Sequence, residues 1–242
     1  MMNSDTIPFK SPLVVGYRGE IGRFILQGLL RVMPKASDIW CFDVNENEKE
    51  KLDRIKKSDT IFLCVPLEET KEWLNKYSDK LGSRIVIEQT SLKDWITNKT
   101  LNSVNLFSMH ILFRPSVTPN KEDRKVILIR RKSNKYWTYN LQEAIKEITD
   151  AEIIYIDTQE HHDLLMAYQQ ALVHRVLLTL EKSICKFPGE TYIGKKVKEL
   201  VSRIKAGNSK LYSLIQGNEQ LPKALREFNK NLKNFNIEEE MK

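Results

Sequence analysis

The stretch LVVGYRGEIG, residues 13–22, decides the fold of this chain. Its first part, Leu13–Gly16, is a short apolar run typical of a buried strand. The glycine-rich turn that follows leads into Glu20–Met33, where apolar residues recur at the spacing of a helix packed on a sheet. A strand, a glycine turn and a helix in this order indicate an α/β fold that binds a dinucleotide phosphate at the helix N-terminus.

The glycines of this turn are close to the GxGxxG pattern of dinucleotide-binding proteins without matching it. Gly19 and Gly22 stand where the second and third glycines belong, Tyr17 stands at the first position, and Gly16 lies one residue earlier. Arg18 either reaches a phosphate or is solvated. The residues expected at the cofactor are Gly16, Tyr17, Arg18, Gly19, Glu20, Ile21 and Gly22.

An acidic residue supports the same interpretation. Asp43 ends the second strand-like run and follows Gly22 by 21 positions. A carboxylate there accepts a hydrogen bond from a ribose 2′-hydroxyl and repels a 2′-phosphate, which favours NAD over NADP. The alternatives are a glycine turn of an unrelated α/β protein and, for Asp43, an ordinary residue at a strand end.

Strand-like runs continue as far as residue 157 and then stop. They occupy residues 13–16, 39–43, 60–65, 84–88, 104–109, 126–129 and 153–156. Helical patterns separate the early runs, so we expect a Rossmann-type, mostly parallel sheet covered on both faces. Helical patterns alone follow, at residues 158–186, 191–205, 210–216 and 219–236. We therefore predict a dinucleotide-binding domain over residues 1–157 and an all-α domain over 158–242 that buries its apolar face in a homodimer.

Composition excludes several classes of protein. The 242 residues include 39 Lys and Arg against 32 Asp and Glu, a net charge of +7, and 41% are hydrophobic, which is typical of a folded globule rather than a disordered chain. Three widely spaced cysteines favour a reducing compartment. Without a signal-peptide pattern or an apolar run of membrane-spanning length, we predict a cytoplasmic protein with no membrane partner. The basic residues are scattered, so nucleic-acid binding is a minor alternative.

Beyond the glycine turn, four more stretches occur in an order that resembles the TyrA family of prephenate and arogenate dehydrogenases. They are Cys64-Val65-Pro66-Leu67, Gln89-Thr90-Ser91-Leu92-Lys93, Met109-His110-Ile111-Leu112-Phe113-Arg114-Pro115, and His162-Asp163 with Met166, Gln170 and His174. The segment from Lys195 to Tyr212 is similar to the substrate-binding region of that family. Each motif alone is weak, but their ordered set is specific and covers nearly the whole chain.

The resemblance implies oxidation of a cyclohexadienyl acid, with hydride transfer to NAD, loss of CO2 and aromatisation. His110 matches the catalytic histidine of the family, and imidazole suits proton transfer from the substrate hydroxyl near neutral pH. Ser91 matches the serine that orients this histidine. Without the resemblance, His110 would be a structural histidine at a strand end and Ser91 the N-cap of a helix. Val65 and Pro66 match residues beside the cofactor.

The residues that match substrate-binding residues of the family lie in the predicted helical domain. Arg203 and the weaker candidate Lys195 would bind the two carboxylates of a prephenate-like acid, for which fork-shaped cations are suited. His162 and Gln170 would line the substrate site. The alternative for Arg203 and Lys195 is a solvated helix surface, and no metal site is expected because the histidines follow no metal-binding pattern.

Two departures from the family leave the substrate open. Ile111 and Arg114 stand where related sequences usually have Pro and Gly, and an arginine cannot silently replace a glycine of positive φ. Arg114 could instead supply a new contact to an anion. We therefore expect NAD-dependent prephenate dehydrogenase activity in tyrosine biosynthesis, with arogenate or a related acid as an alternative substrate. A non-catalytic NAD-binding protein is the alternative from another class.

Overall fold

The structure is a computed structural model that divides the chain into two compact units. Unit 1 comprises residues 1–159 and unit 2 residues 160–242. The boundary lies two residues beyond the one predicted at residue 157. The structure describes residues 8–33, 38–43, 45–118, 120–129, 139–184, 191–207 and 209–235.

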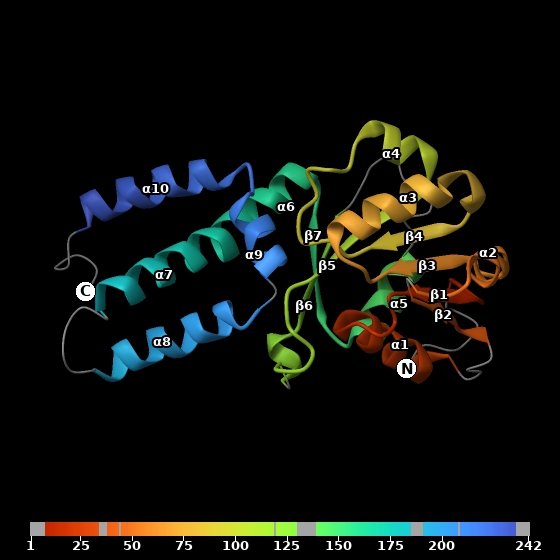
Figure 1. Cartoon of the computed structure of the whole chain (residues 1–242), viewed down its shortest axis with the longest axis horizontal. Helices are drawn as coiled ribbons and strands as arrows, with labels where there is room; N and C mark the ends of the chain where they lie inside the picture. The colour runs from red at the N-terminus through yellow and green to blue at the C-terminus, as the bar shows by residue number, and fades with distance from the viewer. Residues whose placement is uncertain are drawn as a thin grey trace. The chain divides into compact units, whose positions relative to one another are not determined.

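Unit 1 is built on a seven-stranded sheet with the order β2-β1-β3-β4-β5-β6-β7 (Figure 1). The strands are β1 (Pro12–Val15), β2 (Trp40–Phe42), β3 (Thr60–Leu63), β4 (Ile85–Glu88), β5 (Asn105–Ile111), β6 (Lys125–Ile129) and β7 (Glu152–Ile156). The first five are parallel, so their carboxyl ends meet at one edge of the sheet. This confirms the Rossmann-type, mostly parallel sheet that the sequence predicts.

One strand pair departs from the parallel arrangement. β6 runs antiparallel to β5 and parallel to β7. In the described residues between β5 and β6 the chain forms one turn of 3-10 helix, η3 (Lys121–Asp123), and no α-helix. Parallel neighbours are usually joined by a crossover α-helix, whereas antiparallel neighbours need none.

Helices cover both faces of the sheet. They are α1 (Glu20–Val32), α2 (Glu48–Lys57), α3 (Leu67–Leu81), α4 (Asn98–Ser103) and α5 (Tyr139–Thr149). One core cluster contains residues of α1 and α5, and a second contains residues of α2 and α3. α1 and α5 meet where Gly28 faces α5, because a Cβ at Gly28 would lie 2.1 Å from the Ile148 carbonyl oxygen.

Unit 2 consists of helices. They are α6 (Gln159–Met166, which begins at the last residue of unit 1), α7 (Val173–Ile184), α8 (Tyr192–Lys205), α9 (Ser209–Gln216) and α10 (Leu221–Asn234). A π-helical stretch, η4 (Ala167–Leu172), connects α6 to α7, so the single helix predicted over residues 158–186 is interrupted. A small core of Ala171, Ile215 and Leu221 holds η4 against α9 and α10.

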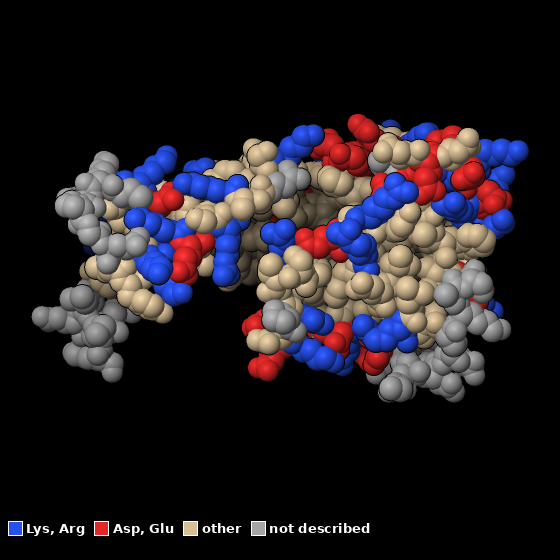
Figure 2. All heavy atoms as spheres, turned by 60° about the horizontal axis from the view of Figure 1, so that its bottom comes forward, with Lys and Arg blue, Asp and Glu red and all other residues tan. Residues whose placement is uncertain are grey.

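The charged side chains of the two units are mixed in sign. On the face shown in Figure 2, Lys and Arg lie beside Asp and Glu on both units, and the described residues of this face form no continuous basic surface. Within the described residues, no helix combines the length and the apolar character needed to cross a bilayer.

Candidate active site

The glycine turn after β1 packs against the end of β3. Gly16 has φ of 80°, which an L-residue with a side chain rarely adopts. A Cβ at this position would lie 2.7 Å from both the Cys64 carbonyl oxygen and Val65 Cγ1. Gly16 therefore makes the tight turn, although it stands one residue before the position expected for this role.

The other two glycines bring the turn close to the start of α1. A Cβ on Gly22 would lie 2.1 Å from the Gly16 carbonyl oxygen, so Gly22 permits the close packing expected of the third glycine. Gly19 is the N-cap of α1, and no side chain caps the helix there. The first backbone N–H groups of α1 are therefore not satisfied by a capping side chain, as a phosphate-binding helix N-terminus requires.

Asp43 lies beside this turn. It follows β2 directly, and its Oδ2 accepts a hydrogen bond of 3.3 Å from the Arg18 backbone N–H. The side chain of Arg18 is exposed, and its Nε donates to the Tyr17 hydroxyl over 3.1 Å. The turn and the acidic residue expected at the ribose are thus brought together by the pairing of β1 with β2.

Glu20, predicted at the cofactor, is bound by the loop that follows β5. Its Oε1 accepts hydrogen bonds from the Ser116 backbone N–H at 2.9 Å and from Ser116 Oγ at 2.6 Å, while Arg114 Nε lies 3.1 Å from Oε2. Partial burial raises the pKa of Glu20, but the bonds from Ser116 and Arg114 outweigh it and hold the pKa below its usual value. Ile21, also predicted at the cofactor, packs against the core.

Arg114 takes a role that the sequence left open. Its contact with Glu20 is an ion pair at an exposed position. Among the described residues outside glycine, only Asp150 has positive φ, so the backbone at Arg114 adopts a conformation open to any residue. The replacement of a family glycine at this position therefore causes no backbone strain.

His110 lies inside β5 rather than after it, because β5 extends two residues beyond the predicted run. The side chain is 5% exposed, and the residue is paired with Ile127 of β6. Ser91 lies three residues beyond the end of β4, the parallel neighbour of β5, so both residues belong to the carboxyl edge of the sheet. The hydrogen bond between Ser91 and His110 stays a prediction.

The alternative role of Ser91 as a helix N-cap is wrong. Residues 91–97 form no helix, and α4 begins only at Asn98. Thr97 caps it, because its Oγ1 accepts a hydrogen bond from the Thr100 backbone N–H.

A buried ion pair between Glu88 and Lys93 holds the segment after β4, and neither residue was predicted to have a role at the site. Lys93 Nζ lies 2.7 Å from Glu88 Oε1, with both side chains fully buried, and also donates to the Met109 carbonyl oxygen over 2.9 Å. Glu88 Oε2 accepts from the backbone N–H and the hydroxyl of Thr90. These bonds fix the residues on both sides of Ser91 and join them to the residue before His110.

A signal for this network exists in the sequence. Glu88 ends an apolar strand of a sheet covered on both faces, and a basic residue follows five positions later. A charge at such a position is buried and needs a charged partner.

Val65 and Pro66 connect the end of β3 to α3. Val65 contacts the glycine turn, and Pro66 is the N-cap of α3. The neighbouring Cys64 Sγ accepts a hydrogen bond from Gln89 Nε2, and burial raises the pKa of this thiol to about 12. Cys64 therefore stays protonated at neutral pH and is not a nucleophile.

In unit 2, His162 is held inside the helical bundle. It is fully buried, and its Nδ1 lies 2.7 Å from Asp163 Oδ1. The backbone carbonyl of Asp163 accepts from Asn218 Nδ2 over 2.8 Å. His162 is thus fixed by its neighbour, and α6 is fixed by the turn before α10.

The π-helical stretch changes the surroundings of Gln170 and His174. The Ala171 carbonyl accepts from Gln216 Nε2 over 2.9 Å, and the His174 ring stacks on Tyr212 with centroids 6.1 Å apart. Burial lowers the pKa of His174. Gln170 Oε1 and His174 Nδ1 are buried atoms without a hydrogen-bond partner among the described residues, so a water molecule or a ligand is needed to satisfy them.

Lys195 and Arg203 lie on α8, with Glu199 midway between them. Both basic side chains are exposed, and within the described part of unit 2 neither takes part in a hydrogen bond or ion pair. Glu199 is hydrogen-bonded to Lys196, and this bond, followed by the charges of Lys195 and Arg203, lowers its pKa. The two predicted substrate cations therefore follow one side of the helix.

The structure brings the predicted residues together in groups. Unit 1 joins the glycine turn, Asp43 and Val65 and carries His110 and Ser91 at the same sheet edge, whereas His162, Gln170, Lys195 and Arg203 belong to unit 2. The convergence of His110 with Arg203 stays a prediction. Among the residues that the structure describes, no three His, Cys, Asp or Glu side chains are grouped as a metal site.

Comparison with known proteins gives similarity at the level of structure. No family profile and no curated protein matches the sequence. Prephenate dehydrogenase from A. aeolicus, solved with hydroxyphenyl propionate and NAD+, is 21% identical with a TM-score of 0.70, covering 93% of this chain and 88% of that one. Synechocystis arogenate dehydrogenase is 19% identical with a TM-score of 0.65, covering 93% and 90%.

A more distant structure belongs to another reaction class. Pyrroline carboxylate reductase from Plasmodium falciparum, solved with NADP, is 16% identical with a TM-score of 0.51, covering 84% of this chain and 82% of that one. The alignments with the two dehydrogenases cover 93% of this chain and therefore include residues of both units. The chain therefore has the fold of the prephenate and arogenate dehydrogenases.

Proposed function

We propose that this protein is an NAD-dependent dehydrogenase of the TyrA family that oxidises and decarboxylates a cyclohexadienyl acid, with prephenate as the substrate. The observation that carries the proposal is the carboxyl edge of the sheet in unit 1. There the glycine turn, too tightly packed for side chains at Gly16 and Gly22, lies at the same edge as the buried His110. Ligands of open α/β sheets bind at this edge.

The residues of the turn fit NAD. Gly16, Gly19 and Gly22 add no side chains to the turn, and the N-terminus of α1 suits a pyrophosphate. Asp43 is suited to a ribose 2′-hydroxyl, and its charge disfavours the 2′-phosphate of NADP. NAD, when bound, supplies the hydride acceptor.

The protein side of the reaction then requires a proton acceptor and two anion contacts. His110 accepts the proton of the ring hydroxyl as its carbon loses hydride and becomes a carbonyl, and Ser91 orients the imidazole. The ring carboxylate leaves as CO2, and its electron pair makes the ring aromatic. Arg203 and Lys195 bind the carboxylates, and His162 and Gln170 line the site, so prephenate and NAD+ give 4-hydroxyphenylpyruvate, CO2 and NADH.

Turnover of prephenate tests the proposal directly. We expect NADH absorbance and 4-hydroxyphenylpyruvate to appear together when the protein is mixed with NAD and prephenate. His110→Asn should lower kcat by roughly 10²-fold or more without changing NAD affinity. The matched control is His161→Asn, an exposed histidine on α6 that should keep full activity. Thermal stabilisation by NAD without product from any cyclohexadienyl acid would identify a non-catalytic protein instead.

Two further measurements examine the substrate. Arg203→Ala should raise KM more than it lowers kcat, because Arg203 is proposed to bind substrate rather than to transfer a proton. A comparison of kcat/KM for prephenate and arogenate decides between the two acids. A higher value for arogenate would replace the proposed substrate while leaving the reaction type intact.

Homodimerisation through unit 2 is part of the same proposal. Large apolar side chains are exposed on its helices, and exposed apolar surface is typical of subunit interfaces. They are Val173, Leu180, Tyr192, Ile193, Leu200, Leu211, Leu232 and Phe235.

A further inference from the structure

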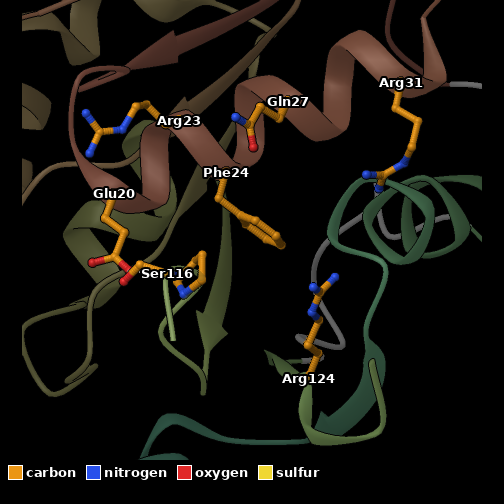
Figure 3. A pocket seen from close by; sticks show the side chains of 8 residues that line it. Glu20, Arg23, Phe24, Gln27, Arg31, Ser116 and Arg124 are labelled. Carbon is orange, nitrogen blue, oxygen red and sulfur yellow. Dashed lines mark hydrogen bonds between the residues drawn. The ribbon is translucent and has the colours of Figure 1, made fainter. Parts of the chain in front are cut away.

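Unit 1 carries a pocket that the proposed reaction does not use. Its volume is about 390 Å³, and it lies between the exposed side of α1, the loop after β5 and the start of β6 (Figure 3). No residue of the turn Gly16–Gly19 lines it. The lining residues are Glu20, Arg23, Phe24, Gln27, Arg31, Pro115, Ser116 and Arg124.

The lining is strongly basic. Three arginines face one carboxylate, and the Glu20 carboxylate is already occupied by Ser116 and by Arg114, which lies outside the lining. The Arg23 side chain is exposed and has no hydrogen-bond or ion-pair partner among the described residues. The pocket therefore has an excess of positive charge.

Two of the arginines are held in place by the fold. Arg31 donates through one nitrogen to the carbonyl oxygens of Glu147 at 2.7 Å and Ile148 at 3.0 Å. Arg124 donates to the Thr118 carbonyl at 3.4 Å and lies 3.5 Å from a carboxylate oxygen of Asp150. These contacts orient the two guanidinium groups in advance, and a guanidinium carries five N–H donors in a fixed plane.

The two guanidinium groups extend toward one another from opposite walls of the pocket, as Figure 3 shows. Like charges in this arrangement repel each other. An anion with two or more oxygens between them removes the repulsion and accepts charge-assisted hydrogen bonds from both.

The remaining wall is apolar. The Phe24 ring extends into the pocket and packs edge-on against Phe113, with centroids 5.4 Å apart at 88°, and Pro115 also lines the wall. This contact fixes the ring position. A ligand with an apolar or aromatic carbon skeleton can therefore lie against Phe24 while its acidic group reaches the arginines.

We propose that this pocket binds a small organic anion, with a carboxylate or phosphate group held by Arg31 and Arg124 and its carbon skeleton against Phe24. The site borders the proposed cofactor turn at Glu20, and the other residues predicted at the cofactor do not line it. Its rim includes Glu20 and Ser116, so an occupant lies against the bond that joins the start of α1 to the loop after His110.

Calorimetric titration with phenyl phosphate and with phenylacetate tests the site without NAD or substrate. The proposed substrate site also accepts aromatic acids, so the binding assigned to this pocket is that which Arg203→Ala leaves unchanged, and the tighter probe identifies phosphate or carboxylate as the preferred group. Arg124→Gln should weaken this binding by about tenfold, the loss expected for one charge-assisted hydrogen bond. Arg23→Gln changes an exposed side chain without a described hydrogen-bond or ion-pair partner, so it should also weaken binding while the fold is retained.

Two arginine controls separate this pocket from other basic surfaces. Arg226→Gln alters an exposed arginine on α10, and Arg18→Gln alters the exposed arginine of the glycine turn. Both should bind the probes like the unmodified protein. Absence of binding of both probes at millimolar concentration, equal binding by the Arg124 and Arg23 variants and the unmodified protein, or loss of binding in Arg18→Gln would overturn the proposal.

Discussion

Glu88 and Lys93 form an ion pair whose two side chains are fully buried. Removing the lysine leaves a carboxylate with no access to water and without its cation. We expect Lys93→Met to lower the free energy of unfolding by about 3–5 kcal/mol, the usual cost of breaking a buried pair. All four tryptophans lie in residues 1–159, so urea unfolding followed by tryptophan fluorescence measures this unit.

The matched control is Lys71→Met, which breaks an exposed pair with Glu68 in the same unit and should cost less than about 1 kcal/mol. Adding Glu88→Gln to Lys93→Met removes the buried charge and should recover part of the loss. Equal midpoints for Lys93→Met and Lys71→Met would show that the buried pair contributes no more than a surface pair.

Glu20 provides a prediction about pH. Since its folded-state pKa is lower than its unfolded value, the carboxylate adds stability above the unfolded pKa, and this contribution disappears as the pH falls through the folded pKa. Arg114→Gly removes one cause of the lowering, so the pKa of Glu20 should rise in a carbon-detected NMR titration of the side-chain carboxyl groups. The pKa of Glu199, which Lys196 lowers, should stay constant in the same titration. An unchanged pKa of Glu20 would assign the effect to Ser116 alone.

At the scale of elements, the contact between α1 and α5 depends on Gly28. A Cβ there would lie 2.1 Å from the Ile148 carbonyl oxygen and 2.8 Å from Ile148 Cγ2, so the helices must move apart. Gly28→Ala should therefore destabilise unit 1 by about 1–3 kcal/mol, although alanine favours an isolated helix by about 1 kcal/mol. Leu30→Ala, on the exposed side of the same helix, should change the urea midpoint little. A stabilised Gly28→Ala variant would show that helix propensity outweighs the contact.

The sequence predicts those elements whose cause is local. Apolar runs indicate all seven strands, and the glycine turn with Asp43 indicates the proposed cofactor site. These signals can be recognised because each depends on residues that are close together in the sequence. The reversal of β6 and the π-helical stretch at Ala167–Leu172 are not predicted. The π-helical stretch has a partner far away in the chain, because the Gln216 amide satisfies the Ala171 carbonyl.

The same distinction applies to the candidate site. His110 and Ser91 could be found from motifs, but their supporting bonds from Lys93 to Glu88 and Met109 join three separate segments of unit 1. Arg114 is a second example. Its partner Glu20 is 94 positions away, and only the folded chain brings the two side chains together. Residue types are therefore predictable at this site, whereas their hydrogen-bond partners are not.

At the scale of the whole molecule, the exposed apolar residues of unit 2 predict a homodimer. Ile193 is 68% exposed and Tyr192 73% exposed on α8, and Leu180 on the adjacent α7 is 44% exposed. Transfer of such side chains from water into an interface contributes roughly 25 cal/mol for each Å² of apolar surface buried. Analytical ultracentrifugation should therefore give a particle of twice the mass of one chain.

Substitution of one exposed side chain tests which surface forms the contact. Ile193→Asp places a charge where the interface is expected and should shift the protein to monomer without unfolding it, because Ile193 makes little contact within its own chain. Leu30→Asp is the matched control on unit 1, where Leu30 is 47% exposed on α1, and it should remain dimeric. If Leu30→Asp dissociates the dimer and Ile193→Asp does not, the interface belongs to unit 1 and the apolar surface of unit 2 has another role.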